Sequence, residues 1–261
     1  MTDRKRLAVV TGASTGIGLE LARICATEGH DLVICAEEAA IHDAAAELGA
    51  LNVAVEAVQA DLGTPEGIDA LWRRVEGRDV DYLLANAGIG LSGPFLDLDR
   101  TDIAKVIALN VSGTTELLHR FARRMRDRGT GRVLVTGSIA GFFPGSFHAV
   151  YNASKAYLDS LSYALQNELK ESPVTVTCLM PGLTETEFFE RAGMTDTPAG
   201  RDDGKDDPAV VARKGYEAMM NGRSGVVTGL MNKVQTAFAG LIPDQVLAQM
   251  HRRLAEPDDL R

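Results

Sequence analysis

Short apolar runs of β-strand type alternate with amphipathic helical stretches along most of this chain, and this order limits the folds open to it. Runs of strand type occupy residues 7–10, 31–36, 52–61, 80–88, 131–138, 174–182 and 224–229. Helical patterns fill residues 16–30, 39–49, 64–77, 101–127, 150–170 and 208–220. We therefore expect an α/β fold, a doubly wound parallel sheet of about seven strands with helices on both faces. We expect it to form a single domain over residues 1–261.

Charge and apolar patterning exclude several functional classes. The net charge of −9 argues against a general affinity for nucleic-acid phosphates. No apolar stretch approaches the roughly 18 residues that span a bilayer, so we expect no membrane partner. The apolar run Leu7 to Val10 is too short for the core of a signal peptide. These features predict a cytoplasmic protein.

Cysteine and histidine usage gives no sign of a disulfide framework or a metal centre. Cys25, Cys35 and Cys178 are far apart and lie in apolar stretches, which predicts three buried thiols. The five histidines are scattered, and none forms a His-x-x-x-His pair or joins a carboxylate cluster. We therefore expect no bound metal.

A glycine-rich turn directly follows the first predicted strand, in the sequence TGASTGIG of residues 11–18. Glycines permit a tight turn and let the backbone approach a pyrophosphate closely. The helix that begins near Gly16 points its free N–H groups and positive dipole end at such an anion. A glycine turn without a ligand is the alternative. The residues expected to contact a dinucleotide here are Gly12, Ser14, Thr15, Gly16, Ile17 and Gly18.

Six motifs, taken in order, resemble those of the short-chain dehydrogenase/reductase family. They are Thr11 to Gly18, Asn86-Ala87-Gly88, Asn110, Ser138, Tyr151-x-x-x-Lys155, and Pro181-Gly182 with Thr184 and Thr186 nearby. The resemblance covers residues 7 to about 190. It implies a Rossmann-type fold, an NAD or NADP cofactor, a small carbonyl or alcohol substrate, and a homodimer or homotetramer built through the 101–127 helix and the helix carrying Tyr151.

The resemblance also assigns further cofactor contacts after the later strands. Asp61 and Leu62 resemble the family's contact to the adenine edge, although Asp61 is equally typical of a helix-capping turn. The remaining assigned contacts are Asn86, Ala87, Gly88, Tyr151, Lys155, Pro181, Gly182 and Thr184.

The choice between NAD and NADP depends on the end of the second strand. Ala36 occupies the family's usual Asp position, Glu37 and Glu38 follow it, and no Lys or Arg comes after them until Arg73. A carboxylate accepts hydrogen bonds from a free 2′-hydroxyl and repels a 2′-phosphate, so we favour NAD. The alternative stays open, because the two glutamates can face solvent while Ser14 or Arg73 reaches a phosphate.

Tyr151 and Lys155 are four residues apart on a predicted helix and therefore share one face. Tyrosine ordinarily has a pKa of about 10, too high for efficient acid/base catalysis at neutral pH. We expect the Lys155 ammonium to lower that pKa, and Ser138 to hold the substrate oxygen near the phenol. By resemblance, Lys155 also grips the nicotinamide ribose, and Asn110 kinks its helix and anchors a water that links Lys155 to solvent.

Several aromatic residues follow the catalytic motifs and predict a largely apolar substrate site. They are Phe142, Phe143, Phe147, Phe188 and Phe189, together with Pro144 and Met194. Residues 183–208 are expected to cover this site. Within them, the polar stretch 190–208 is expected to be a mobile surface loop, with a domain linker as the alternative. The amphipathic tail 243–257 is expected to cover the sheet or an interface. His148 is close enough to Tyr151 to reach the pocket, although an isolated His is more often packed or solvated.

These observations predict an NAD(P)-dependent oxidoreductase that moves a hydride between the nicotinamide and a small, largely apolar alcohol or ketone. Two alternatives remain. One is a nucleotide-binding sensor or scaffold of the same fold. The other is an enzyme of different chemistry, such as an imine reductase, an epimerase or a dehydratase, because one fold supports many reactions.

Overall fold

A computed structural model describes residues 4–229 and 242–257 of the chain, and the rest of the predicted domain 1–261 lies outside the described residues. Its centre is a parallel sheet of seven strands in the order β3-β2-β1-β4-β5-β6-β7. The strands are β1 (Leu7–Thr11), β2 (Asp31–Ala36), β3 (Val55–Gln59), β4 (Tyr82–Ala85), β5 (Gly131–Thr136), β6 (Val174–Met180) and β7 (Gly225–Val227). The strand order reverses beside β1, which pairs with both β2 and β4. This confirms the doubly wound α/β fold.

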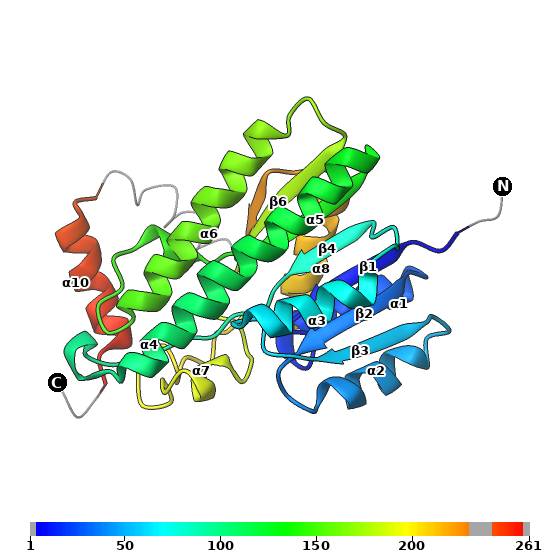
Figure 1. Cartoon of the computed structure of the whole chain (residues 1–261). Helices are drawn as coiled ribbons and strands as arrows, with labels where there is room; N and C mark the ends of the chain where they lie inside the picture. The colour runs from blue at the N-terminus through cyan, green and yellow to red at the C-terminus, as the bar shows by residue number, and fades with distance from the viewer. Residues whose placement is uncertain (1–3, 230–241, 258–261) are drawn as a thin grey trace.

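Helices cover both faces of the sheet, as Figure 1 shows. One apolar core joins the sheet to α1 (Gly16–Thr27), α2 (Ile41–Gly49) and α8 (Pro208–Met220). A second joins it to α3 (Pro65–Val75), α5 (Thr114–Arg128) and α6 (Ala149–Glu168). Successive strand residues alternate between these cores, with Val10 in the first and Val9 in the second. Both faces of the strands are therefore buried, which explains their nearly continuous apolar sequences.

The predicted helix over 101–127 is interrupted in its first half. It consists of α4 (Arg100–Val106), a π-helical segment η2 (Ile107–Gly113) and then α5. Gly113 passes so close to α3's leading loop that a Cβ there would lie 2.1 Å from the carbonyl oxygen of Leu62. Such π-segments often occur at functional sites, and this one contains Asn110.

The segment 183–208, which the sequence predicts to cover the site, contains regular structure. A parallel bridge joins Thr184 to Asp206, and the short helix α7 (Phe188–Arg191) lies between them. Phe189, Met194 and neighbouring alanines form a small apolar cluster of their own. The C-terminal tail forms α10 (Asp244–Ala255), which Figure 1 shows beside the first turns of α6.

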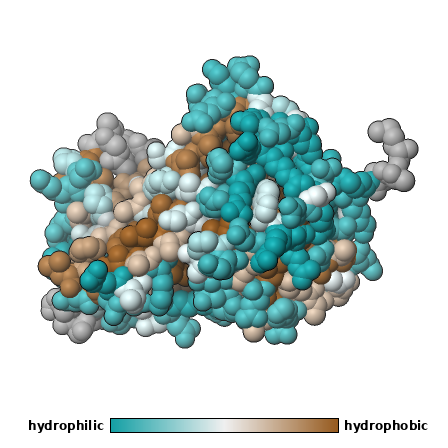
Figure 2. Space-filling model, viewed as in Figure 1, coloured by the Kyte–Doolittle hydropathy of each residue, from teal (hydrophilic) through white to brown (hydrophobic). Residues whose placement is uncertain are grey.

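Apolar side chains also gather on one outer surface. Figure 2 shows them around η1 (Phe95–Asp97) and over α4 and the first half of α6. The exposed large apolar residues of this region include Leu96 of η1, Ile107 at the start of η2 and Tyr157 of α6. The last short helical turn, η3 (Ile139–Phe142), connects β5 to the loop before α6.

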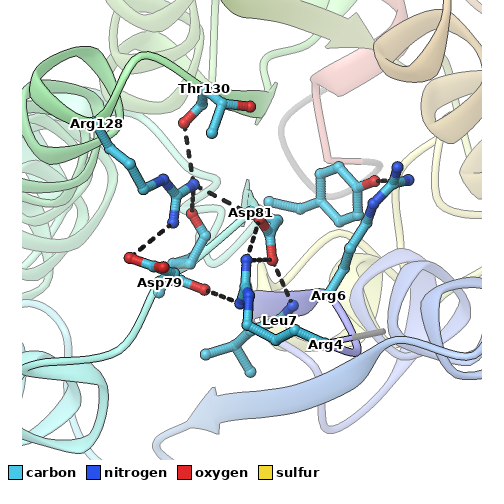
Figure 3. A network of polar contacts seen from close by, with 9 residues as sticks. Arg4, Arg6, Leu7, Asp79, Asp81, Arg128 and Thr130 are labelled. Carbon is cyan, nitrogen blue, oxygen red and sulfur yellow. Dashed lines mark hydrogen bonds and ion pairs between the residues drawn. The ribbon is translucent and has the colours of Figure 1, made fainter. Parts of the chain in front are cut away.

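The amino ends of the central strands are tied together by an ionic network, shown in Figure 3. The carboxylate of Asp81 accepts hydrogen bonds from the Leu7 backbone N–H at 2.9 Å and from the Arg4 guanidinium at 2.9 Å. Arg128, at the end of α5, donates to the carbonyl oxygens of Val80 and Thr130. The predicted functional residues lie at the carboxyl ends of the strands. The ionic network lies at the opposite end of the sheet.

Candidate active site

A cavity of about 840 Å³ opens at the carboxyl ends of the strands, where doubly wound sheets bind ligands. All the predicted catalytic and cofactor residues line it except Gly18 and Asn110. The cavity therefore brings together Ser138, Tyr151 and Lys155 with Gly12, Ser14, Thr15, Gly16, Ile17, Glu37, Asp61, Leu62, Asn86, Ala87, Gly88, Pro181, Gly182 and Thr184.

The turn between β1 and α1 has room only for glycine at two of its three glycine positions. Gly12 has a φ of 64°, and a Cβ on it would lie 2.8 Å from the Ala87 Cα. A Cβ on Gly18 would lie 1.9 Å from the Gly12 carbonyl oxygen. Gly18 thus allows α1 to pack against the turn rather than lining the cavity. The exposed backbone of the turn and the N-terminus of twelve-residue α1 form a cradle that fits a pyrophosphate.

Thr11 and Asn86 brace this cradle from behind. The Thr11 hydroxyl accepts hydrogen bonds from the backbone N–H groups of Asn86 and Ala87, both at 3.0 Å. The Asn86 amide donates to the Thr11 and Gly12 carbonyl oxygens and accepts from the Thr136 hydroxyl at 3.0 Å. The side chain of Asn86 therefore holds β1, β4 and β5 in register at the site.

At the end of β2, Glu38 is held by two partners. It accepts a hydrogen bond from the Ser14 hydroxyl at 2.9 Å and forms an ion pair with Arg191 of α7. Glu37 lines the cavity beside it, whereas Arg73 does not line it. Among the described residues, Arg191 is the one arginine that lines this cavity, and it was not predicted from the sequence. Its partnership with Glu38 connects segments that are 153 positions apart, so no local signal revealed it.

Asp61 plays the capping role that the sequence left open for it. Its carboxylate accepts a hydrogen bond from the Gly63 N–H at 2.7 Å, and its carbonyl oxygen accepts one from the Thr64 hydroxyl. Thr64 in turn caps α3 by accepting from the Gly67 N–H, with Pro65 as the first helical residue. Asp61 and Leu62 still line the cavity, so their backbone and side chains remain available to an adenine ring.

The three side chains of the predicted reacting centre converge from two elements. The phenol of Tyr151 is hydrogen-bonded to the side chain of Ser138, which lies just after β5. Lys155 is one turn further along α6, with its Nζ 5.8 Å from the centre of the Tyr151 ring. That ammonium donates to the Thr136 carbonyl oxygen at 2.7 Å. All three residues are largely buried, although each lines the cavity.

The electrostatic balance at Tyr151 differs from the sequence-based expectation. Burial raises the pKa of Tyr151 to about 12, the Ser138 hydrogen bond works against that rise, and the nearby Asp159 carboxylate adds to it. Among the protein's own groups, burial thus outweighs every influence that favours the phenolate. Lys155 is not among the groups that shift the pKa of Tyr151, so the expected lowering is not present, and burial lowers the pKa of Lys155 itself to about 8.

Asp159 is a buried carboxylate that the sequence analysis did not single out. It lies one turn beyond Lys155 on α6 and accepts hydrogen bonds from the Ser138 N–H at 3.4 Å and the Cys178 thiol at 3.3 Å. Burial raises the pKa of Asp159 to about 6, and Lys155 works against that rise. A Cβ on Gly137 would lie 1.8 Å from the carboxylate, so the β5 corner is shaped around it. The spacing of four residues between Lys155 and Asp159, which places both on one face of the helix, was the sequence signal that could have identified Asp159.

Asn110 lies behind the cavity wall. Its amide donates to the Ile89 carbonyl oxygen at 2.9 Å and to the Ser154 hydroxyl at 3.0 Å, and it accepts from the Ile89 N–H. Both amide protons are therefore used in fixing the segment after β4 against α6. A Cβ on Gly88 would lie 3.2 Å from this amide oxygen and 3.5 Å from the Lys155 Nζ. Asn110 of the interrupted helix and Lys155 of α6 thus both lie against Gly88.

The far end of the cavity is largely apolar. Phe143, Phe188, Phe189 and Met194 line it, whereas Phe142, Pro144 and Phe147 do not, which corrects the wider wall predicted from sequence. Phe147 instead packs against Arg252 of α10, with the guanidinium carbon 5.3 Å from the ring centre. Helix α10 closes this end and contributes Leu247, Met250, His251, Leu254 and Ala255 to the lining.

Other features predicted from sequence have these outcomes. Cys25, Cys35 and Cys178 are buried free thiols. Within residues 4–229 and 242–257, no cluster of three or more His, Cys, Asp or Glu is arranged to hold a metal ion. None of the helices in those ranges has the length and apolarity to cross a bilayer.

Comparison with known proteins identifies the family. The family model for short chain dehydrogenases matches residues 6–196. Human 17-beta-hydroxysteroid dehydrogenase type 1 is 34% identical over 194 residues, which span 72% of this chain and 59% of that enzyme. The chain therefore spans less than two thirds of the length of that relative.

Two solved structures share the fold over nearly their whole length. A short-chain dehydrogenase from Sphingobium yanoikuyae in complex with NADPH is 31% identical, with a TM-score of 0.81 over 90% of this chain and 94% of that one. The bulky-bulky ketone specific alcohol dehydrogenase from Comamonas testosteroni is 27% identical, with a TM-score of 0.77 over 90% and 93% of the two chains. Together with the cavity and its ordered motifs, these matches show that this chain belongs to the short-chain dehydrogenase family.

Proposed function

We propose that this protein is an NAD(P)-dependent dehydrogenase or reductase that acts on a largely apolar alcohol or ketone. The observation that carries the proposal is the convergence of Ser138, Tyr151 and Lys155 in the same cavity as the glycine turn. The volume of this cavity, about 840 Å³, is in the upper part of the usual range for ligand cavities. Relatives named for hydroxysteroid and bulky ketone substrates support the apolar class.

The side chains of the site have separate roles in this reaction. The dinucleotide, when bound, supplies or accepts the hydride at the carbonyl carbon. Tyr151 donates its proton to the carbonyl oxygen in reduction and removes the hydroxyl proton in oxidation. Ser138 holds the same oxygen through a hydrogen bond, which keeps it close to the phenol. Lys155, whose pKa of about 8 leaves it charged at neutral pH, stabilises the negative charge that develops on the phenol as the phenol gives up its proton.

We further propose a preference for NAD over NADP. Glu37 and Glu38 stand at the end of β2, and the charge of Arg191 is offset by Glu38 and Glu187. A 2′-phosphate bound at the end of β2 would therefore lie beside two carboxylates, and the arginine there is already ion-paired. The buried thiols and negative net charge support the predicted cytoplasmic location and small-molecule partnership, and both stay predictions.

A single experiment tests the function. The purified protein is titrated with NADH and NADPH and then supplied with a panel of ketones, or with NAD+ or NADP+ and a panel of alcohols, while reduced cofactor is followed by its near-ultraviolet absorbance. Stoichiometric cofactor consumption with a ketone supports the proposal. Cofactor binding without turnover of any panel member favours the sensor alternative, and substrate conversion without net cofactor consumption favours a redox-neutral reaction.

A further inference from the structure

A buried histidine without a hydrogen-bond partner lies in the apolar end of the cavity. His148 is 4% exposed and lines the cavity three residues before Tyr151, with the two rings 5.0 Å apart. Among the described residues, its Nε2 atom has no hydrogen-bond partner. Leaving such a polar atom unpaired destabilises the folded protein. A buried polar atom of this kind is explained if a polar group of a bound ligand forms the hydrogen bond.

A second histidine faces the same region from the C-terminal helix. The ring of His251 on α10 lies 6.2 Å from that of His148, and it also lines the cavity. Its Nδ1 is 3.0 Å from the carbonyl oxygen of Ser146. Since a carbonyl oxygen only accepts, Nδ1 carries the proton in this bond, and Nε2 of the neutral ring is left as an acceptor.

Both imidazoles are neutral under ordinary conditions. Burial lowers the pKa of His148 to about 3, and burial also lowers the pKa of His251. Six carboxylates of the described residues line the same cavity, and those of Glu187, Asp202 and Asp206 belong to the segment 183–208. A negatively charged substrate group would therefore meet repulsion without a compensating cation from either imidazole.

A hydroxyl is the group that suits this pair, since it donates and accepts at once. It can donate to the Nε2 acceptor of His251 and accept from His148, which then holds its proton on Nε2. A second ketone oxygen accepts only and satisfies one of the two. We propose that His148 and His251 form a hydroxyl-binding subsite, so that the preferred substrate is a neutral hydroxy ketone, or the diol formed from it. The inference rests on the proposed function and adds the recognition of a second oxygen. Because His148 adjoins Tyr151, that oxygen lies within a few bonds of the reacting carbonyl.

The test compares matched substrates rather than absolute rates. Cyclic ketones and their hydroxylated analogues, differing only in the position of one hydroxyl, are assayed with the wild type, His148→Phe, His148→Gln and His251→Phe. The measured quantity is the ratio of kcat/KM for each hydroxy ketone to that of its parent ketone. The ratio cancels general effects of a substitution on the site, and thermal melting reports folding of each variant. His119→Gln is the matched control, because His119 is an exposed histidine on α5 outside the cavity.

We expect at least one hydroxy isomer to be preferred roughly tenfold by the wild type, the size of one good hydrogen bond. The preference should fall towards unity in His148→Phe and His251→Phe, recover partly in His148→Gln, and persist in His119→Gln. A wild type that favours no hydroxy isomer, or a preference that survives both phenylalanine variants, would overturn the subsite. If the wild type reduces no ketone at all with either cofactor, the proposed function fails instead. Where His148→Phe does not fold, equilibrium binding of the hydroxylated and parent alcohols to wild type and His251→Phe with cofactor present decides the question in the same way.

Discussion

Asp159 lies one helical turn beyond Lys155, and its carboxylate opposes the effect of burial on that amine. Burial lowers the pKa of Lys155 to about 8, while Asp159 and, to a lesser degree, Cys178 work in the opposite direction. Since burial raises the pKa of Asp159 to about 6, both groups are charged between about pH 6 and pH 8. In this window Lys155 carries the positive charge that the proposed mechanism uses.

The Asp159→Asn variant is expected to lose activity at a lower pH than the wild type. Neutralising the carboxylate removes an interaction that raises the pKa of Lys155, so the ammonium deprotonates earlier as pH rises. The pH profile of kcat/KM measures this as a shift of the alkaline limb towards neutral pH. A purely structural role for Asp159 would reduce activity evenly across pH and leave the limb in place.

The Tyr151→Phe variant should lose at least about a hundredfold in kcat, the usual contribution of a positioned acid or base. The phenyl ring preserves the packing against His148 and Phe188, whose ring centres lie 5.0 and 5.1 Å away. Cofactor affinity, measured by titration of NADH fluorescence, is expected to change little. Near-normal turnover in this variant would show that another group moves the proton.

Replacing Glu38 by Gln should shift the cofactor preference towards NADP. The change removes a carboxylate from the end of β2 and releases both the Ser14 hydroxyl and the Arg191 guanidinium. We expect the ratio of Kd values for NADPH and NADH to fall by roughly tenfold, about 1.4 kcal/mol. Glu47→Gln makes the same change in charge outside the cavity, at the partner of Arg23, and serves as the control. An unchanged ratio in Glu38→Gln would show that the 2′-position is read elsewhere.

The Asp81→Ala variant should be destabilised without a defect in cofactor binding. Its carboxylate accepts from the Leu7 N–H and from Arg4, and Arg128 lies 3.7 Å away, all at the amino ends of β1 and β4 (Figure 3). Losing a charged acceptor that is mostly buried costs about 2 kcal/mol. Urea unfolding measures this loss as a lower midpoint. A weaker Kd for NADH in the folded variant would contradict the separation of this network from the site.

The exposed apolar surface of the central helices predicts self-association, as the family resemblance also does. Ile107 is 45% exposed and Tyr157 is 40% exposed, on η2 and α6 respectively, and Figure 2 shows this apolar region. Light scattering after size exclusion should report a dimer or tetramer. Ile107→Glu should weaken that assembly, because a carboxylate would be buried at the contact. A monomeric wild type at micromolar concentration would contradict the prediction.

The sequence by itself determined the fold class, the strand order along the chain and the order of the motifs. Periodicity predicts the strands because both sheet faces are buried, and the glycine turn is recognisable because its crowding excludes every side chain larger than hydrogen at Gly12 and Gly18. Strand boundaries were less accurate. The predicted strand 52–61 extends only over Val55–Gln59. The run 80–88 contains the strand Tyr82–Ala85 and then the expected turn, in which Asn86 and Ala87 leave the sheet and donate to the Thr11 hydroxyl.

Only the tertiary structure decided which distant side chains meet. Arg191 pairs with Glu38, Asp159 lies beneath Ser138, and His251 of α10 faces His148, and each contact joins elements whose separation in sequence carries no periodic signal. The sequence also left undecided the charge of each ionisable side chain in the site, because desolvation depends on the groups that surround that side chain in the folded protein. Burial moves the pKa of Tyr151, Lys155 and His148 away from their ordinary values, and burial is a property of the packed fold rather than of any local stretch of chain.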